Sequence, residues 1–297
     1  MIINYIGINQ NKTLISLGKN DGFSIIGVYK NNLIVEKKTH EIHIVEIYYN
    51  TNIIFIVGDN NLLNTLNIYD DLKKKYIANI KIQNKIESIK INKKYIILSD
   101  SNYIYIYNFT NLSYLNKFKF KNKSNNLFDL SNNNFLVYSN NNGYINIYNC
   151  DTHSNKLIKN HDNNIQFIKV SNNNKYIASV SINGNVIKLY DYEKNKIIKL
   201  FYRGFYNSTI NSLEFDKNDN YLFCYSEYTI HIFSINKKNP SLLYFDIWNY
   251  EKNLYQINLK TNNNIIIITD YNQIDVINKN NLKKDKYLLV NDYYEIN

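Results

Sequence analysis

An all-β fold built from repeated four-stranded units is predicted by three features of this 297-residue sequence. Helical periodicity is almost absent, and short runs of Ile, Tyr and Val recur between Asn-rich turns along the whole chain. The first strand of each unit begins 38 to 45 residues after the previous one. These starts are Ile2, Ile44, Ile86, Leu127, Ile165, Ile210 and Leu254. A period near 40 residues is typical of one propeller blade, so seven starts predict a seven-bladed β-propeller of the WD-repeat type.

The strands within each unit can be predicted in the same way. The third unit predicts strands at residues 86–91, 95–99, 103–108 and 115–120. The fifth unit predicts strands at residues 165–170, 176–181, 186–190 and 196–200. Third strands end in Tyr69-Asp70 and Tyr190-Asp191, where WD-type repeats often carry Trp-Asp. With only 8 Gly and 1 Pro, Asn is expected to take most turn positions that need a positive φ.

No linker or shift of composition marks a domain boundary, so a single domain over residues 1–297 is predicted. Two β-sandwiches are the alternative that the strand pattern alone leaves open. The first segment is short, polar-interrupted and strand-like, and it predicts neither a signal peptide nor a spanning helix. Cys150 and Cys224 lie in apolar strand-like segments, which indicates a reducing compartment and neither a disulfide framework nor a metal site.

The net charge is +10 and the pI about 9.2, a balance that suits nucleic acid, an anionic membrane or no particular partner. The lysines are scattered, which favours a solvated surface and argues against nucleic acid. The five histidines show no spacing typical of metal ligands, and no phosphate loop, nucleophile elbow or kinase motif occurs. We therefore expect no catalytic residue, metal or cofactor. His161 precedes the first strand of the fifth unit, where a structural hydrogen bond is its predicted role.

One pair of residues predicts an anion site. Arg203 and Gly204 lie between two β units that each carry Ser or Thr at a turn. A guanidinium grips phosphate bidentately, and hydroxyl and main-chain N–H groups complete such a site. Thr229 and His231 are two apart on one predicted strand, so their side chains share a face, and Ser226 is close by.

A second segment combines basic and aromatic residues. Lys237 and Lys238 precede an apolar stretch whose large side chains are Leu242, Leu243, Tyr244, Phe245 and Trp248. Such a segment could touch a membrane, with its aromatics at the headgroup level and its lysines on acidic lipids. It could equally be the fourth strand of blade six, and both interpretations stay open. If it touches the membrane, it should lie on the same rim as Arg203.

Nearly the whole chain resembles the PROPPIN family of seven-bladed propellers, which bind phosphoinositides and act in autophagy. The resemblance rests on the order and spacing of several segments. These are residues 17–23, 44–47, 51–58, 68–75 and 104–110, the strand Thr229-Ile230-His231-Ile232-Phe233, and Tyr244, Phe245 and Trp248.

What the resemblance implies depends on the family's Phe/Leu-Arg-Arg-Gly motif, whose two arginines serve two lipid pockets. Here the motif reads Phe201-Tyr202-Arg203-Gly204, so Tyr202 replaces the first arginine. The resemblance therefore implies one phosphoinositide site, on the blade-six side. That site comprises Arg203, Gly204, Ser226, Thr229 and His231. A weaker second site is expected at Ser181, Gly184, Asn185, Lys188 and Tyr202, where Asn185 stands at the family's usual Thr.

Three further departures concern the turns. The segment Ser226-Glu227-Tyr228-Thr229 is one residue shorter than the family's turn and lacks its Gly. The blade-two turn, residues 58–63, lacks the Pro-containing loop that family members use against a lipid-transfer partner. The segment at residues 236–243 is also shorter than the family's usual membrane-inserting loop.

From these residues we predict a monomeric scaffold that is cytoplasmic and peripheral on autophagosomal, endosomal or vacuolar membranes. It is expected to bind phosphatidylinositol 3-phosphate, with the 3,5-bisphosphate as the alternative lipid, and a protein partner such as an autophagy lipid-transfer protein. The rival interpretations are a propeller scaffold that has lost lipid binding, a nucleic-acid-binding propeller and, least supported, an enzyme.

Overall fold

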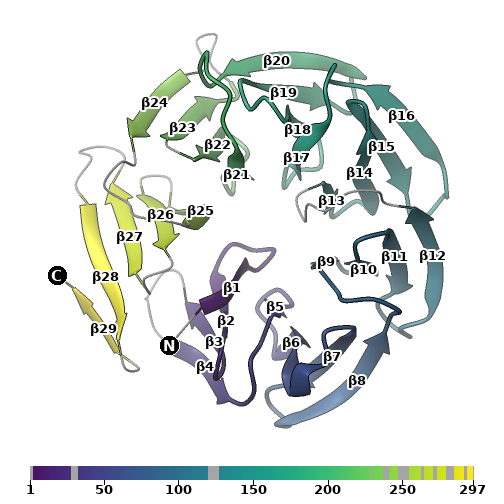
Figure 1. Ribbon diagram of the computed structural model, residues 1–297, viewed down its shortest axis with the longest axis vertical. Helices are drawn as coiled ribbons and strands as arrows, with labels where there is room; N and C mark the ends of the chain where they lie inside the picture. The colour runs from purple at the N-terminus through teal and green to yellow at the C-terminus, as the bar shows by residue number, and fades with distance from the viewer. Residues whose placement is uncertain are drawn as a thin grey trace. The chain divides into compact units, whose positions relative to one another are not determined.

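The computed structural model describes residues 3–27, 33–119, 127–227, 229–236, 241–246, 254–261, 264–269, 273–278, 284–290 and 293–296 (Figure 1). Within these ranges the regular structure is β-strand, apart from one 3₁₀ turn, η1 (Asp59–Asn61). No helix in the described ranges has the length and apolarity needed to cross a membrane. The predicted all-β class is confirmed.

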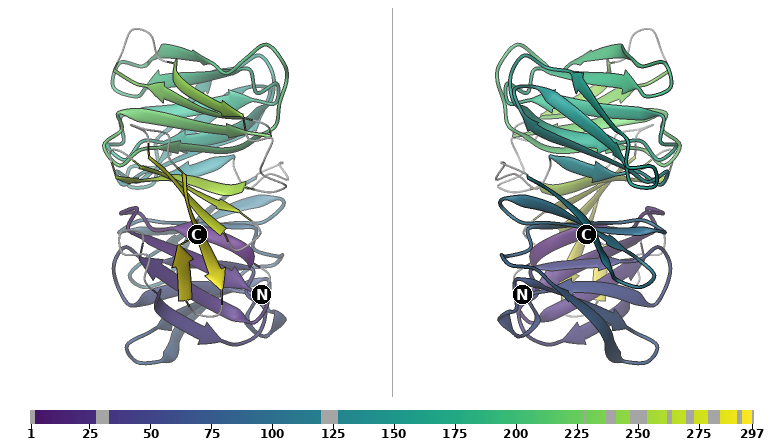
Figure 2. Two further views of the ribbon diagram at one scale, coloured as in Figure 1. Left: turned by 90° about the vertical axis from the view of Figure 1, so that its left-hand side faces the viewer. Right: turned by 90° about the vertical axis from the view of Figure 1, so that its right-hand side faces the viewer.

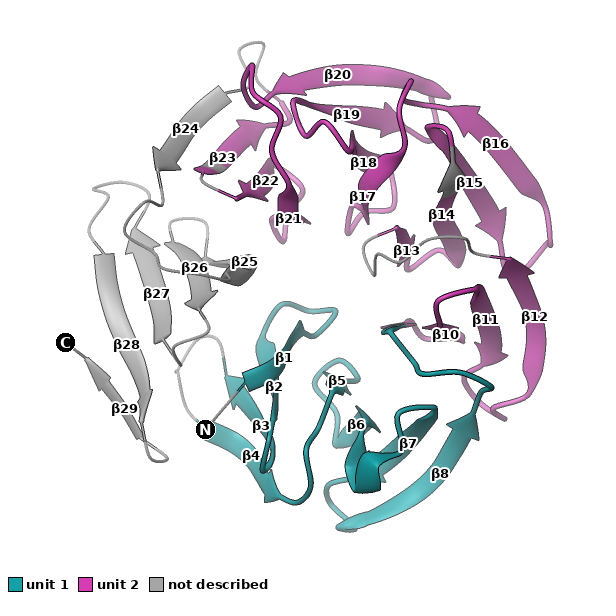
Figure 3. Ribbon diagram, in the orientation of Figure 1, with its two compact units in different colours: residues 1–89, 252–297 teal, residues 90–251 magenta. Residues whose placement is uncertain are grey.

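The chain divides into two compact units, residues 1–89 with 252–297 and residues 90–251 (Figure 3). The prediction of a single domain over residues 1–297 stays a prediction. The first unit contains β1 (Ile3–Ile8), β2 (Leu14–Lys19), β3 (Gly22–Gly27), β4 (Leu33–Lys38), β5 (Ile44–Ile47), β6 (Ile53–Val57), β7 (Thr65–Asp70), β8 (Lys75–Lys81), β25 (Leu254–Thr261), β26 (Asn264–Thr269), β27 (Gln273–Asn278), β28 (Lys284–Val290) and β29 (Tyr293–Ile296).

The second unit begins within β9 and carries the next four sheets. Its strands are β9 (Ser88–Ile91), β10 (Tyr95–Ser99), β11 (Tyr103–Asn108), β12 (Tyr114–Lys119), β13 (Phe128–Leu130), β14 (Phe135–Asn141), β15 (Tyr144–Asn149), β16 (Asn155–Lys159), β17 (Ile165–Val170), β18 (Tyr176–Ser181), β19 (Val186–Asp191), β20 (Lys196–Tyr202), β21 (Ile210–Phe215), β22 (Tyr221–Ser226), β23 (Thr229–Ser234) and β24 (Ser241–Asp246).

The described strands pair with their sequence neighbours into antiparallel sheets, which twist as the side views show (Figure 2). Each of the seven predicted starts lies within two residues of a sheet's first strand. The count of seven blades is nevertheless not confirmed. Among the described strands, six sheets have the four strands of a propeller blade, whereas the C-terminal sheet has five. The extra strand arises because β29 returns antiparallel along β28, with Tyr293 opposite Val290, and occupies the sheet's open edge.

Burial explains the pattern of apolar and polar residues along each strand. All five residues of β10 are buried, whereas β12, the fourth strand of the same sheet, alternates between exposed and half-buried positions. A strand covered on both faces is apolar throughout, and an outer strand covered on one face shows a period of two. Asn supplies six of the twelve non-glycine residues with positive φ in the described ranges, so it is the main but not the majority turn residue there.

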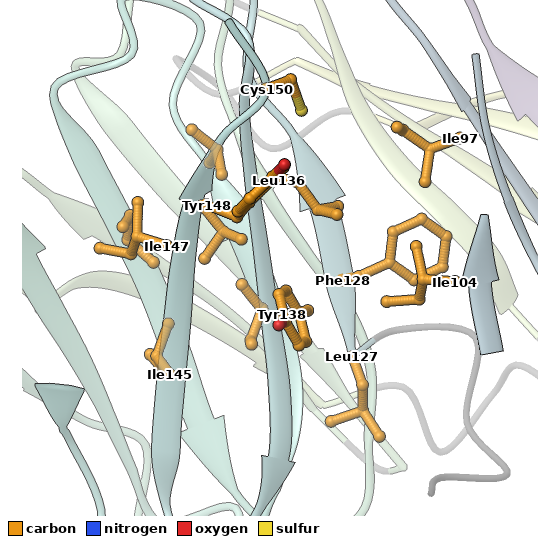
Figure 4. Packing of buried hydrophobic residues seen from close by; sticks show 14 of the residues in the cluster. Ile97, Ile104, Leu127, Phe128, Leu136, Tyr138, Ile145, Ile147, Tyr148 and Cys150 are labelled. Atoms are coloured by element: carbon orange, nitrogen blue, oxygen red, sulfur yellow. The ribbon is translucent and has the colours of Figure 1, made fainter. Parts of the chain in front are cut away.

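The core of the second unit lies between neighbouring sheets. One cluster, drawn in Figure 4, joins β10 and β11 to the sheet β13–β16 through residues such as Ile97, Phe128 and Tyr138. A second cluster lies between the fifth sheet (β17–β20) and the sixth sheet (β21–β24). There the rings of Phe201 and Phe233 stack with their centroids 5.0 Å apart. The residue after Phe201 and Tyr202 is Arg203, so this packing anchors the predicted anion site.

Candidate functional site

The Arg203 side chain is held by two backbone carbonyls, one from the turn at residues 182–185 and one from its own loop. Arg203 follows β20 and opens the arginine loop, residues 203–209, which leads to β21. Its Nε donates to the carbonyl oxygen of Gly184 at 2.7 Å, and its Nη2 donates to that of Tyr206. Its own N–H donates to the carbonyl of Asn185 at 2.8 Å. The guanidinium is therefore oriented before any ligand arrives.

No carboxylate of the described residues forms an ion pair with Arg203. Burial lowers the pKa of Arg203, because part of its hydration has been lost. A half-buried cation without an anionic partner favours an anionic ligand, and a guanidinium held on one side keeps N–H groups for it.

Three polar side chains of the sixth sheet form a hydrogen-bonded row. The hydroxyls of Ser226 and Thr229 are 2.8 Å apart across the turn between β22 and β23. The Thr229 hydroxyl is also 2.9 Å from Nε2 of His231, two residues further along β23. Ser226 is fully buried, His231 is nearly so, and the His231 ring stacks on Phe233. The structure thus brings Ser226, Thr229 and His231 together, and their assignment to an anion site stays a prediction.

The row lies on the same face of the sixth sheet as Cys224, whose thiol feels the charge of Arg203. Cys224 is the cross-strand neighbour of His231, and directly opposed residues of an antiparallel pair point to the same face. The positive charge of Arg203 acts on the buried Cys224 thiol, although burial prevails and raises its pKa to about 12. The thiol is thus protonated and buried, and the face carries two hydroxyls and an imidazole.

Gly204 lies in open space, and its assignment to the lipid site stays a prediction. A Cβ built on Gly204 would meet no protein atom within 4 Å, so no contact with a neighbouring segment requires glycine there. Its carbonyl accepts a hydrogen bond of 3.1 Å from the side-chain amide of Asn185, which also donates to the Phe205 carbonyl at 2.6 Å. Gly204 belongs to the scaffold of the arginine loop.

The five residues assigned to a weaker second site have different roles in the structure, and their assignment to a site stays a prediction. Gly184 and Asn185 bind the arginine loop, and Tyr202 is an exposed side chain at the end of β20. Lys188 lies opposite Ser179 in the pairing of β18 with β19. The Ser181 carbonyl accepts from the Gly184 N–H within the turn. Because Ser181 is two residues from Ser179 on β18, Ser181 and Lys188 share a face of the fifth sheet, whereas Gly184 and Asn185 are bonded to the arginine loop.

Comparison of the strand register in the fifth and sixth sheets shows which residues of the fifth sheet correspond to Thr229 and His231. Lys188 opposes Ser179 in the fifth sheet as His231 opposes Cys224 in the sixth, so Lys188 occupies the position of His231. By the same register Val186, not Asn185, corresponds to Thr229. The fifth sheet therefore has an apolar residue at the position of the bridging hydroxyl. Aligning the paired strands of the two units would have shown this from the sequence.

His161 has the structural role that the sequence predicted. Its Nε2 lies 2.9 Å from the hydroxyl of Ser179, and the Asn160 amide donates to the same hydroxyl at 2.6 Å. Burial and the nearby charge of Lys188 lower the pKa of His161 to about 4. The imidazole is therefore neutral near pH 7, and sequence analysis did not associate Asn160 or Ser179 with it.

The predicted membrane segment falls mostly outside the described residues. Lys237, Lys238 and Trp248 lie in undescribed stretches, and of Leu242, Leu243, Tyr244 and Phe245 the structure describes the strand β24 alone. Asn236, just before the lysines, bonds to Asn220 in the turn between β21 and β22. That turn is at the opposite end of the sixth sheet from Ser226 and Thr229, since hairpin turns alternate between ends. The other end of β24 lies beside Thr229, since Asp246 is opposite Thr229. The two flanks thus lie at opposite ends of the sheet, and a shared rim of the whole segment with Arg203 stays a prediction.

No group of three or more metal-ligating side chains occurs within the described ranges. The identified groups are an oriented guanidinium and a row of two hydroxyls and an imidazole. Such a set can bind and orient an anion such as a phosphomonoester.

The chain is similar to known proteins over most of its length. The sequence profile of the PROPPIN family matches residues 3–243. Autophagy-related protein 18 of Kluyveromyces lactis is 24% identical over 80% of this chain and 62% of its own length. Autophagy-related protein 18 of Dictyostelium discoideum is 28% identical over 78% of this chain and 65% of its own length. The chain thus spans less than two thirds of these relatives.

Two solved structures cover all of this chain. Hsv2 of Kluyveromyces lactis has a TM-score of 0.84 at 19% identity, with 98% of that chain covered. The complex of KlAtg21 with the coiled coil of AgAtg16 has a TM-score of 0.81 at 20% identity, again with 98% covered. These similarities show the β-propeller fold.

Proposed function

The chain belongs to the PROPPIN family, and on that premise we propose that it binds the phosphorylated inositol headgroup of a membrane lipid at Arg203. The lipid is phosphatidylinositol 3-phosphate, with the 3,5-bisphosphate as a second candidate. The bound protein is a peripheral membrane scaffold in autophagy or membrane trafficking, on the cytoplasmic side of autophagosomal, endosomal or vacuolar membranes.

One observation carries the proposal. Lys and Arg together number 35, and Arg203 is the single arginine, which leaves 34 lysines. In a chain that uses lysine for every other basic position, arginine stands where the guanidinium fork is used, between the carbonyls of Gly184 and Tyr206. A lysine ammonium cannot keep both contacts in that fixed plane and also present donors to an anion.

The chemistry of the surrounding face suits a phosphomonoester. Such a group carries a charge of about −1.5 to −2 near pH 7 and three acceptor oxygens. The Arg203 guanidinium supplies charge-assisted donors, and the Thr229 hydroxyl and His231 imidazole lie on the same face of the sheet.

A protein partner is part of the proposal. One structural neighbour is a complex of KlAtg21 with a coiled coil, which supports partner binding by a propeller of this kind. For this chain we propose a protein partner of the autophagy machinery, recruited while the lipid site holds the propeller at the membrane.

Vesicle sedimentation tests the function. Vesicles of phosphatidylcholine and phosphatidylserine, with or without phosphatidylinositol 3-phosphate, are mixed with the wild-type chain and with Arg203→Ala. We expect the wild type to sediment with the phosphoinositide vesicles and the variant to lose about 2–5 kcal/mol of binding free energy.

The matched control is Lys196→Ala, which removes one exposed positive charge from the other end of the same strand, β20. It should bind like the wild type. Two outcomes would contradict the proposal: sedimentation that is the same with and without the phosphoinositide, or sedimentation that falls equally in both variants. Either would favour a scaffold without a lipid site or a non-specific attraction to anionic surfaces.

A further inference from the structure

The arginine loop is hydrogen-bonded to the rest of the second unit at both of its ends. Asn185 donates side-chain hydrogen bonds to the carbonyls of Gly204 and Phe205, at 3.1 and 2.6 Å. At the far end, the Ser208 N–H donates to the Asn183 carbonyl at 3.1 Å, and the Thr209 carbonyl accepts from Glu227 at 3.0 Å. The loop therefore has a fixed backbone without a regular strand.

Glycine makes this close contact possible. Gly184 has φ +70°, and a Cβ placed on it would lie 1.9 Å from the Ser208 carbonyl oxygen. The two backbones can thus approach at this point because residue 184 has no side chain. The turn at residues 182–185 and the arginine loop form one rigid platform.

The platform exposes its largest apolar side chains. Phe205 is 100% exposed and Tyr206 88% exposed, and both belong to the loop that the hydrogen bonds immobilise. Tyr202, before the loop, and Ile182, on the opposing turn, are 67% and 54% exposed. Large apolar side chains that stay exposed to water contribute no burial free energy to folding. A group of them on the surface marks a binding surface.

The occupant must match both the apolar tips and the cation beside them. Residues 182–185 and 203–209 contain no Asp or Glu, and their one charged side chain is Arg203. The Tyr206 carbonyl binds the Arg203 guanidinium, so the aromatic tips and the anion site are parts of one loop. A phospholipid bilayer presents phosphate groups directly beside apolar acyl chains. Aromatic side chains such as Tyr and Phe are suited to the headgroup level of the bilayer.

We propose that Phe205 and Tyr206 are a membrane anchor that enters the outer layer of a bilayer while Arg203 holds a lipid phosphate. This inference rests on the proposed function, which it deepens by assigning the anchor to the arginine loop. Tyr202 and Ile182 border the anchor and widen the contact. The rigid backbone keeps the distance between phosphate and tips constant, so neither group has to be ordered at binding.

The experiment separates anchor from headgroup site. The double variant Phe205→Ser with Tyr206→Ser keeps the backbone carbonyl that binds Arg203 and removes no buried side chain. Its affinity for soluble inositol 1,3-bisphosphate, measured by calorimetry, should equal that of the wild type. Its binding to vesicles that contain phosphatidylinositol 3-phosphate should fall tenfold or more, because burial of one such aromatic side chain is worth roughly that factor.

Two controls complete the design. Leu72→Ser removes a side chain that is 80% exposed in the turn after β7, and it should leave vesicle binding unchanged. Phe205→Trp, which keeps an interfacial aromatic, should retain vesicle binding. Unchanged vesicle binding by the double variant, alongside loss in Arg203→Ala, overturns the anchor and leaves the headgroup site standing. A wild-type chain that binds neither soluble headgroup nor phosphoinositide vesicles overturns both.

Discussion

At the scale of single residues, function depends on what surrounds a side chain more than on its type. Arg203 and Lys188 are both basic; Lys188 lies within β19, and Arg203 directly follows β20 of the same sheet. Arg203 is oriented by two carbonyls, whereas Lys188 lies near the buried imidazole of His161. Only the first arrangement presents an oriented cation to an outside anion.

Replacement of Arg203 by lysine tests whether geometry or charge matters. Arg203→Lys keeps the positive charge but loses the planar fork and the Nε bond to Gly184. We expect headgroup affinity to fall by about 1.5–3 kcal/mol, the usual value of a hydrogen bond to a charged group. Calorimetry with soluble headgroup measures the change. An affinity equal to that of the wild type would mean that charge alone suffices.

His161 predicts a pH dependence of stability. Its pKa is about 4 in the folded chain and near the ordinary 6.5 when unfolded, so between these values the unfolded chain binds more protons. The free energy of unfolding should therefore fall as the pH drops from about 6.5 towards 4, by up to about 3 kcal/mol. In His161→Gln this slope should largely disappear. Urea unfolding at pH 7 and pH 5 measures this free energy in both chains. An equal change between the two pH values in the wild type and in His161→Gln would contradict the role of His161.

At the scale of elements, two short segments with no regular structure position the site. The turn at residues 182–185 supplies the Gly184 carbonyl to Arg203, and it docks against Ser208 of the arginine loop. The strands β18 and β19 fix where the turn lies, and Phe201 packed on Phe233 fixes where the loop begins. The loop geometry is thus a consequence of sheet packing.

A pair of glycine substitutions tests this element. Gly184→Ala places a Cβ at positive φ and against the Ser208 carbonyl, so we expect a loss of about 1–3 kcal/mol in stability and weaker headgroup binding. Gly204→Ala points into open space and should change stability by less than about 0.5 kcal/mol. Thermal unfolding and calorimetry compare the two. Similar effects from both would contradict the platform geometry.

At the scale of the whole molecule, the repeat makes a second site conceivable, and the register of the fifth sheet argues against it. Val186 stands where the sixth sheet has Thr229, and Lys188 stands where it has His231. Of the five residues predicted for a second site, Gly184 and Asn185 are bonded to the arginine loop. A net charge of +10 adds a general attraction to anionic surfaces but gives no second oriented donor set.

We therefore expect one headgroup per chain. Titration of the wild type with soluble inositol 1,3-bisphosphate should give a stoichiometry near one, and Arg203→Ala should remove it. Tyr202→Ala should not change the stoichiometry, because its exposed phenol offers one neutral hydrogen bond. Two equivalent sites per chain would show that the fifth sheet retains a pocket.

Much of this protein could be predicted from its sequence because the deciding patterns are local. Period-two alternation and Asn-rich turns located the strands, and all seven starts lie within two residues of those observed. The same alternation placed Thr229 and His231 on one face, where they form a hydrogen bond. A strand carries its own face assignment in its sequence, since each residue points opposite to the one before it.

Tertiary structure alone decided the contacts between segments. Gly184 and Asn185 were assigned to a second site, yet they bind the arginine loop, almost twenty residues further along the chain. The exposure of Phe205 and Tyr206 and the fifth strand of the C-terminal sheet were likewise not predicted. Which loops meet, and which side chains remain in water, depends on how packed sheets bring distant turns together. No local period in the sequence records that outcome.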